Sequence, residues 1–411
     1  MRNNKNYRFY ASCPWGLEKL LADEAKGCGA LRIRTTPSGI AFEGTLEVGY
    51  ALCLRTRLAS RVLLEVGFHD YWDSRDIYDL ARKTPWEQYF MPSQTFKVSL
   101  SAHRAPLKSL EFTTLRIKDA ICDRFMEMAG KRPDVDRESP QVQVAAFLDE
   151  KYCTLYVDLS GEALFKRGWR TDKGEAPLKE NLASGLLMLS GWDAESQLLL
   201  DPFCGSGTIA IEAACAACGM APGLKRHFGF EKLANFDAEA WSELREDARS
   251  EVNMHADLRI RASDISSRVV EKARANALRA GLAPLLEDGR LAFDVKDARE
   301  ITPPEGAEPG LIVANPPYGE QSNPRTATVG SMMRKVADNL KQKFPGWTAW
   351  MLTSDLHLPG QMHLKESRRT VLFNGPLECR FFRFDLVAGS NRRVKKSEAI
   401  EAPKAAGAAK A

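Results

Sequence analysis

Long apolar runs are absent from this sequence. No run approaches the ~20 apolar residues that a helix needs to span a bilayer. The opening segment, MRNNKNYRFYASC, also lacks the apolar core of a signal peptide. We therefore expect a cytoplasmic protein without a membrane partner.

Cysteine and histidine patterns that hold disulfides or metals are missing too. The nine cysteines are an odd number without a framework spacing, and the six histidines show no ligand spacing. Cys215 and Cys218 have the spacing of a zinc or redox half-site, but they lie in an Ala-rich run with no second pair. We expect buried thiols of a reducing compartment and no metal.

A strong surplus of one charge is the third absence. The net charge is +4 over 411 residues, which does not establish any partner by itself. Residues 1–170 carry 26 basic and 22 acidic residues, whereas residues 171–390 carry 26 basic and 30 acidic residues. The segment 391–411 has 6 basic and 2 acidic residues. Attraction to phosphate is therefore expected at the front of the chain and in the tail.

What the sequence does contain begins with short, mixed elements. Periodicity predicts strands or helices over 7–11, 14–25, 33–42, 46–57, 95–102, 112–128, 141–147 and 152–159. The first part of this order, β-α-β-β-α, is typical of a compact α+β module packed on one sheet face. The length of the chain allows two or three domains, and a polar, Gly-containing stretch predicts a boundary near 160–176.

From residue 195 aliphatic strands alternate with helices, which predicts a parallel sheet covered on both faces. The predicted strands are 197–200, 258–262, 291–295 and 311–314, with helices at 207–217 and 268–280. Ligands of such sheets bind at the carboxyl ends of the strands. The polar residues that follow the strands are therefore candidates for one site.

The first strand runs into Asp201-Pro202-Phe203-Cys204-Gly205-Ser206-Gly207-Thr208. Two glycines permit a tight turn and close approach to a ligand. No Lys-Ser/Thr follows them, as a P-loop requires, and Ala210 stands where a dinucleotide fingerprint has its third glycine. A carboxylate before the turn favours a cation, such as the amino group or sulfonium of S-adenosylmethionine.

The next two strands end in Asp264 and Asp297. Asp264 is placed to accept from both ribose hydroxyls of a nucleoside, and Asp297 is placed to accept from an adenine amino group. Each acidic residue alone could equally be a helix N-cap or a turn residue. Together, in order along one sheet, they favour a nucleoside site.

The fourth strand ends in Asn315-Pro316-Pro317-Tyr318. Two prolines make this segment stiff. The Asn315 amide and the Pro316 carbonyl can accept from an exocyclic amine, while the Tyr318 ring can stack on the base. A structural turn is the alternative, because Pro-Pro is common in loops.

The motifs DPFCGSGT, ASDIS, KDA and ANPPYG resemble motifs one to four of class I S-adenosylmethionine-dependent N-methyltransferases. The flanks GEAPLKENLASGLLMLSGW, APGLKRHFGFEK and FNGPLECRFFRF are similar to the bacterial THUMP-domain guanine-N2 methyltransferases of large-subunit ribosomal RNA. RIKDAICDRF, KRPDVDRESP and LYVDLSGEALFKRGWR resemble the THUMP module, and FYASCPWGLEKLLADE resembles the small domain before it. The resemblance covers about residues 7–386. Phe203-Cys204 in motif one and Ser266 in motif two are mild departures.

This resemblance implies a Rossmann-like α/β class I methyltransferase domain at 161–390. It would follow an α+β RNA-binding region made of a ferredoxin-like domain at 1–50 and a THUMP domain at 51–160. The tail 391–411 is expected to be disordered. In some relatives a second methyltransferase domain follows; here the Ala/Lys-rich tail stands in its place, so we expect no second activity.

The resemblance also implies the reaction: transfer of a methyl group from S-adenosylmethionine to guanine N2 of 23S ribosomal RNA, free or in a pre-50S particle. Asn315, Pro316 and Tyr318 would be catalytic, and Asn315, Pro317 and Tyr318 would hold the base. The implied cofactor residues are Asp201, Phe203, Gly205, Ser206, Gly207, Thr208, Asp264, Ile265, Asp297, Ala298 and Asn315.

Several interpretations remain open at this point. The chemistry also suits an adenine-N6 nucleic-acid methyltransferase or a tRNA guanine-N2 methyltransferase, and a non-catalytic RNA-binding assembly factor is an alternative from another class. The run Phe165 to Arg170 mixes cations with aromatics. Lys166, Arg167 and Arg170 are thus equally candidates for RNA contacts and for packing at a domain boundary.

Overall fold

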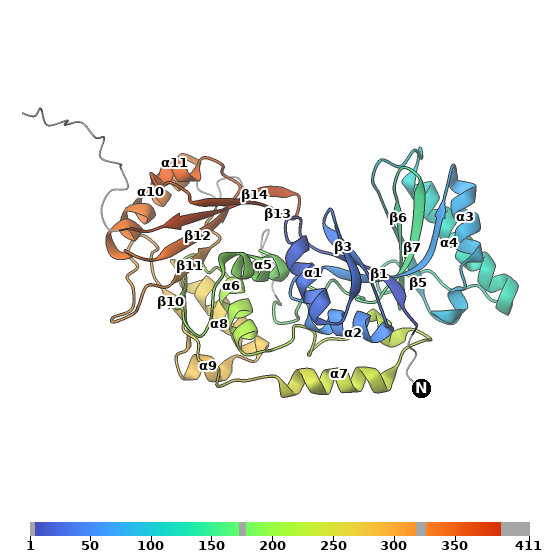
Figure 1. Cartoon of the computed structure of the whole chain (residues 1–411), viewed down its shortest axis with the longest axis horizontal. Helices are drawn as coiled ribbons and strands as arrows, with labels where there is room; N and C mark the ends of the chain where they lie inside the picture. The colour runs from blue at the N-terminus through green and yellow to red at the C-terminus, as the bar shows by residue number, and fades with distance from the viewer. Residues whose placement is uncertain (1–4, 172–177, 318–325, 388–411) are drawn as a thin grey trace, which may run out of the picture.

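The computed structural model describes residues 5–171, 178–317 and 326–387 of the chain, which form two seven-stranded sheets (Figure 1). The first sheet contains β1 (Tyr7–Ser12), β2 (Leu31–Thr36), β3 (Gly39–Gly44), β4 (Arg61–Asp70), β5 (Phe96–Ala102), β6 (Val142–Leu148) and β7 (Tyr152–Asp158). Its strand order is β2-β3-β1-β4-β7-β6-β5. β4 pairs with β1 on one side and β7 on the other, so a single sheet joins the two parts of the front region.

One face of this sheet carries the helices α1 (Glu18–Gly27), α2 (Leu46–Arg55), α3 (Ser74–Lys83) and α4 (Leu110–Ala129), with the short η1 (Trp86–Gln88). Alternate strand residues such as Phe9, Val62 and Val144 are buried in one core with residues of all four helices. The side chains between them point to the other face. Strand residues on that face line an open groove of about 1170 Å³.

The second sheet contains β8 (Leu199–Asp201), β9 (Ile260–Asp264), β10 (Leu291–Val295), β11 (Leu311–Ala314), β12 (Thr348–Thr353), β13 (Arg368–Asn374) and β14 (Leu377–Asp385). Its order is β10-β9-β8-β11-β12-β14-β13. The first five strands are parallel, and β14 is antiparallel to both of its neighbours. The predicted parallel α/β sheet is confirmed, while the β13–β14 hairpin at its edge was not predicted.

Helices cover both faces of the second sheet. The helices of this part of the chain are α5 (Glu180–Ser190), α6 (Thr208–Ala217), η2 (Gly229–Lys232), α7 (Ala238–Ser250), α8 (Ser267–Ala280), α9 (Ala283–Glu287), α10 (Thr326–Lys343) and α11 (Leu358–Met362). Of these, η2 and α7 pack on the front region instead (Figure 1): the Phe230 ring of η2 contacts Tyr50 of α2 and Trp241 of α7, with centroids 4.2 and 4.9 Å away. Buried residues of α6 and α8 pack in the same core as those of the front region. Residues of α10 and α11 form a separate core on the other face. In the part of the chain that is described, no helix is long and apolar enough to cross a membrane.

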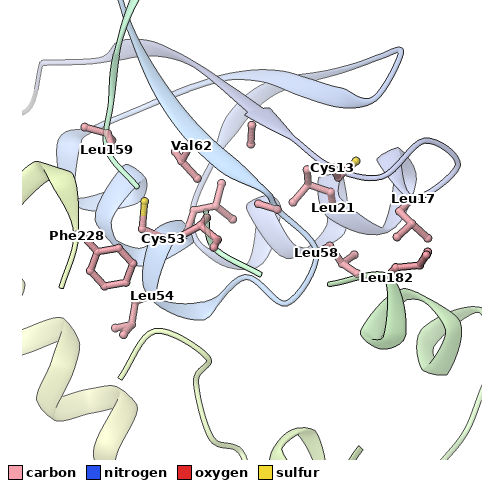
Figure 2. Close-up of a cluster of buried hydrophobic side chains, with 14 of the residues drawn as sticks. Cys13, Leu17, Leu21, Cys53, Leu54, Leu58, Val62, Leu159, Leu182 and Phe228 are labelled. Carbon is pink, nitrogen blue, oxygen red and sulfur yellow. The ribbon is translucent and has the colours of Figure 1, made fainter. Parts of the chain in front are cut away.

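The two sheets share a packed junction, shown in Figure 2, where Leu17, just before α1, and Leu21 of α1 lie near Leu58 and near Leu182 of α5. Gly185 of α5 is so close to Leu17 that an added Cβ would lie 2.4 Å from its Cδ1. The Arg57 guanidinium also donates to the carbonyls that end and follow α6, at Cys215 and Met220 (3.2 and 2.7 Å). The domain limits at 50, 160 and 390 stay predictions, and the first of them falls inside α2.

Candidate active site

The strands β8, β9, β10 and β11 run parallel, so their carboxyl ends meet at one edge of the sheet. Asp201 pairs with Ala262, two residues before Asp264, and Val295 pairs with Asp264. Leu200 pairs with Ile312, which puts Asn315 two residues beyond the level of Asp201. The sheet thus brings the four predicted strand ends together.

Asp201 is a buried carboxyl group with an open acceptor. Only 1% of the residue is exposed. Its Oδ1 accepts from the backbone N–H of Phe203 at 3.2 Å, whereas Oδ2 has no hydrogen-bond partner among the described residues. Burial raises the pKa of Asp201 to about 8, and the nearby charge of Asp264 adds to the rise. A ligand cation would supply the missing partner.

The turn after Asp201 depends on its glycines. Gly205 and Gly207 both have positive φ, +52° and +86°. A Cβ on Gly207 would lie 3.0 Å from a Phe293 ring carbon, so the start of α6 is packed tightly against the sheet. A Cβ on Gly205 would meet nothing within 4 Å. The open space above Gly205 and the unpartnered Asp201 oxygen together fit a small cationic ligand.

Asp264 fixes this turn from the neighbouring strand. Its Oδ2 accepts from the Gly205 N–H at 3.2 Å, and its Oδ1 accepts from the Ser266 N–H at 3.0 Å, at the start of α8. An ionised carboxylate offers about four lone-pair sites, so each oxygen can still accept a ribose hydroxyl. The next residue, Ile265, is 66% exposed, which leaves an apolar surface for a flat ring.

Asp297, unlike Asp201, already has a charged partner. Both of its oxygens contact the Arg299 guanidinium, and its Oδ1 also accepts from the Arg299 backbone N–H at 2.8 Å. Hydrogen bonds from Arg299 lower the pKa of Asp297. An adenine amino group would therefore share Asp297 with a guanidinium, which the sequence did not indicate. Its neighbour Ala298 is buried in the core beside α10.

The Asn-Pro-Pro segment leaves the sheet directly beside Asp201. All four residues of β11 are buried, and the Pro316 ring is buried while Asn315 and Pro317 are partly exposed. This burial pattern supports a rigid segment at the mouth of the site. Tyr318, predicted to be catalytic, lies outside the described residues.

Comparison with known proteins fits this geometry. The family model described as RMKL-like methyltransferase domain matches residues 167–383, more than half of the chain. The chain belongs to this RMKL-like methyltransferase family. Models of an RlmL ferredoxin-like domain and of a THUMP domain match residues 8–63 and 72–158. The resemblance to a THUMP-domain methyltransferase with a ferredoxin-like domain in front is thereby confirmed.

Individual relatives cover nearly all of the chain. A ribosomal RNA large subunit methyltransferase K/L of Shewanella baltica (strain OS185) is 39% identical over 392 residues, which are 94% of this chain and 54% of that protein. The chain thus spans about half the length of the curated relatives it matches. The structure of a methyltransferase complexed with SAH has a TM-score of 0.83 at 25% identity and covers 94% of this chain and 100% of the other. A predicted N6-adenine-specific DNA methylase from Listeria monocytogenes str. 4b F2365 has a TM-score of 0.82 at 28% identity, with 92% and 96% covered.

Within this RMKL-like domain, two cations of the 165–170 run are internal. Arg167 is buried 3.4 Å from the Glu212 carboxylate and donates to the Arg57 carbonyl at 2.6 Å. Arg170 donates to the Thr208 hydroxyl at 2.5 Å, at the first residue of α6. Lys166 is exposed and pairs with Glu162 at 2.5 Å. These positions favour packing at the boundary, and the RNA contacts of this run stay predictions.

The role of Arg170 was not visible in the sequence. Its guanidinium lies 3.3 Å from the Glu180 carboxylate at the start of α5, so it ties α5 to the start of α6. Only the fold places these three segments together. Among residues 5–171, 178–317 and 326–387 there is no group of three His, Cys, Asp or Glu side chains that could hold a metal ion.

Proposed function

We propose that this member of the RMKL-like methyltransferase family transfers a methyl group from S-adenosylmethionine to the exocyclic N2 of a guanosine in 23S ribosomal RNA. The observation that carries the proposal is the buried, unpartnered Oδ2 of Asp201 beside the Asn315–Pro317 segment. The family and the K/L relative support methyl transfer to large-subunit RNA. The choice of guanine N2 depends on the motif resemblance.

The cofactor would be held by the residues of the first three strand ends. S-adenosylmethionine, when bound, supplies an electrophilic methyl group on a sulfonium. Asp201 Oδ2 accepts from its cationic end, and the Gly205 backbone leaves space for it to approach. Asp264 accepts from the ribose hydroxyls with lone pairs not used for the turn. Ile265 covers the adenine ring.

The Asn315–Pro317 segment would position the target base. The Asn315 side-chain oxygen and the Pro316 carbonyl accept the two hydrogens of the guanine amine. Two acceptors favour a more tetrahedral nitrogen whose lone pair faces the methyl group. Placement and electrostatics supply most of the acceleration. The methylated nitrogen then loses its proton to Asn315 or water, so no strong base is required.

The deciding experiment is methylation of purified large-subunit RNA and tRNA, side by side, by this protein with labelled S-adenosylmethionine. Mass spectrometry of the nucleosides should find N2-methylguanosine in the large-subunit RNA alone. Transfer to tRNA alone would replace the proposed substrate, and no transfer to any RNA would favour a non-catalytic assembly factor. Ribosomal RNA from a strain lacking the protein should miss one methyl group, and mapping it identifies the nucleotide.

An adenine-N6 methyltransferase is the second candidate, because the Listeria neighbour is described as an N6-adenine-specific DNA methylase. Asn-Pro-Pro can accept from either amine. The same nucleoside assay separates the two, since N6-methyladenosine would appear in place of N2-methylguanosine. Our proposal includes a cytoplasmic location and a substrate that is either free 23S RNA or a pre-50S particle. Transfer to isolated pre-50S particles but not to free RNA would identify the particle.

A further inference from the structure

A hollow of about 700 Å³ lies between the front region and the β13–β14 hairpin. Its walls include Trp15 and Ser38 from the front region, Lys179 before α5, and Phe373 and Glu378 from the hairpin. Figure 1 shows the hairpin reaching toward α1 and β3. The volume is within the range of ordinary small-molecule sites, about 300–1,000 Å³. No residue of the predicted cofactor site lines it.

The hollow opens at the same sheet edge as the candidate active site. Strand register places Ala314 of β11 level with Arg369 of β13 through β12 and β14. Phe373 is thus four residues past that level, on the side where Asn315 leaves β11. β11 and β13 are three strand steps apart, or ~14 Å at the usual spacing. A polynucleotide with its target base at Asn315 can therefore reach the hollow with a nearby nucleotide.

The walls of the hollow are held in place by hydrogen bonds. The Glu18 carboxylate accepts from the backbone N–H groups of Gly16 and Ser38, both at 2.9 Å. It thereby links the loop before α1 to the β2–β3 turn. Gly16 has a φ of +92°, and a Cβ there would lie 2.7 Å from the Val371 carbonyl oxygen of β13. The loop that carries Trp15 is therefore packed directly on the hairpin strand.

The side chains in the hollow suit a nucleotide. Trp15 is 41% exposed, and its indole meets the Phe373 ring edge to face, with centroids 5.5 Å apart. The Lys179 ammonium lies 4.9 Å from the Phe165 ring centroid and can still donate to a phosphate. Glu378, the carboxylate of the hollow, is paired with Arg380 at 2.6 Å. An exposed indole stacks on any base, and a nearby cation attracts the phosphate.

The hollow continues into the open groove of the first sheet. Cys13 and Ser38 line both cavities. Three carboxylates of the groove pair with arginines: Glu65 at 2.6 Å, Glu43 at 3.1 Å and Asp158 with Arg61. A fourth, Asp149, accepts from backbone N–H groups. Arg34 and Lys97, which also line it, form no ion pair with any described residue. A chain of phosphates leaving the hollow would meet these cations along the sheet face.

We propose that this hollow binds a nucleotide flanking the methylated one, with its base stacked on Trp15 and its phosphate near Lys179. The strand continues along the groove of the first sheet. This inference rests on the proposed function only for the position of the target base at Asn315, from which the RNA runs toward the hollow. The hollow fixes the register of the RNA relative to Asn315 and so contributes to the choice of nucleotide.

The test measures methyl transfer to purified 23S ribosomal RNA by Trp15→Ala and Trp15→Phe. Loss of base stacking should raise the KM for RNA about tenfold in Trp15→Ala, with kcat within about twofold, and Trp15→Phe should keep most of the affinity. Calorimetric affinity for S-adenosylmethionine should not change, which shows that the domain is folded. Trp72→Ala is the matched control, because Trp72 is 87% exposed and does not line the hollow. An unchanged KM in Trp15→Ala, or an equal rise in Trp72→Ala, would overturn the inference.

Ultraviolet crosslinking of the wild-type protein to the same RNA separates this inference from the proposed function. The tryptic peptide that spans residues 9–19 should carry a crosslinked nucleotide. That crosslink supports the hollow even if the protein methylates a different RNA. Methyl transfer to 23S RNA without a crosslink in 9–19, and with normal kinetics of Trp15→Ala, would keep the function and reject the hollow.

Discussion

At the residue scale, the proposed role of Asp201 predicts that cofactor binding depends on pH. Its pKa is raised to about 8 by burial, so the free protein holds this carboxyl protonated at neutral pH. A cationic cofactor requires the ionised form. The affinity for S-adenosylmethionine should therefore rise about tenfold per pH unit between about pH 6 and 7.5. Calorimetry in buffers of different ionisation enthalpy should detect release of nearly one proton.

Asp201→Asn is the control for this pH dependence. The variant should bind the cofactor more weakly and with a flat pH profile over the same range. If the affinity of Asp201→Asn for S-adenosylmethionine rose with pH as steeply as that of the wild type, Asp201 would not be the group that titrates on binding.

The raised pKa of Asp201 also predicts how the stability of the folded protein changes with pH. An ordinary Asp titrates near about 3.9, so the stability from this group is complete below that pH and is lost as the pH rises through about 8.

A substitution of Asn315 tests whether the Asn315–Pro317 segment positions the target base. Asn315→Ala should leave the calorimetric affinity for S-adenosylmethionine within a few-fold, because the buried β11 and Pro316 still shape the pocket. Methyl transfer should fall below detection, because the amine loses its acceptor. Turnover on 23S RNA comparable to the wild type would show that Asn315 does not position the base.

At the scale of elements, the two glycines of the turn between β8 and α6 should affect different properties: Gly207 the stability of the fold and Gly205 the binding of the cofactor. Gly205 and Gly207 both have positive φ, which costs a non-glycine residue ~1–2 kcal/mol. Gly207→Ala also forces a Cβ against Phe293, so it should lose a further ~1–3 kcal/mol of unfolding free energy. Gly205→Ala meets no protein atom, yet its methyl group occupies the proposed cofactor space.

We therefore expect the two variants to rank in opposite order for unfolding stability and for cofactor affinity. Denaturant unfolding should find Gly207→Ala the less stable protein. Calorimetry should find that Gly205→Ala loses cofactor affinity out of proportion to its small loss of stability. If Gly205→Ala binds S-adenosylmethionine like the wild type, then the cofactor does not pass over this turn.

Short apolar runs that end in polar residues made the second sheet predictable, because periodicity and turn chemistry are local. β4 was missed for the opposite reason: its ten residues mix charges with aliphatics, and only pairing with both β1 and β7 defines it. The pairing of Asp297 with Arg299 depends on side-chain conformation. The raised pKa of Asp201 depends on burial that only the folded sheet creates.

At the scale of the whole molecule, the junction in Figure 2 connects the first sheet to the second sheet through one core. Cys13 and Leu182 of this junction (Figure 2) also line the hollow at Trp15, so the junction and the hollow share a wall. Leu17, just before α1, packs closely on Gly185 of α5, where an added Cβ would lie 2.4 Å from the Leu17 side chain. This pair therefore offers a direct test of coupling between the two halves.

Leu17→Ala should cost ~2–5 kcal/mol of unfolding free energy through the cavity it leaves, and Gly185→Ala should cost ~1–3 kcal/mol through overpacking. In the double variant the new methyl group of residue 185 occupies space vacated by Leu17. The double variant should then be more stable than the sum of the single losses by ~1 kcal/mol or more. The measurement is chemical denaturation, followed by the fluorescence of the tryptophans on both sides. Strict additivity would mean that residues 17 and 185 do not compete for this space. Two separate unfolding transitions in the wild type would mean that the halves fold independently and that the junction does not set the geometry between the proposed RNA surface and Asn315.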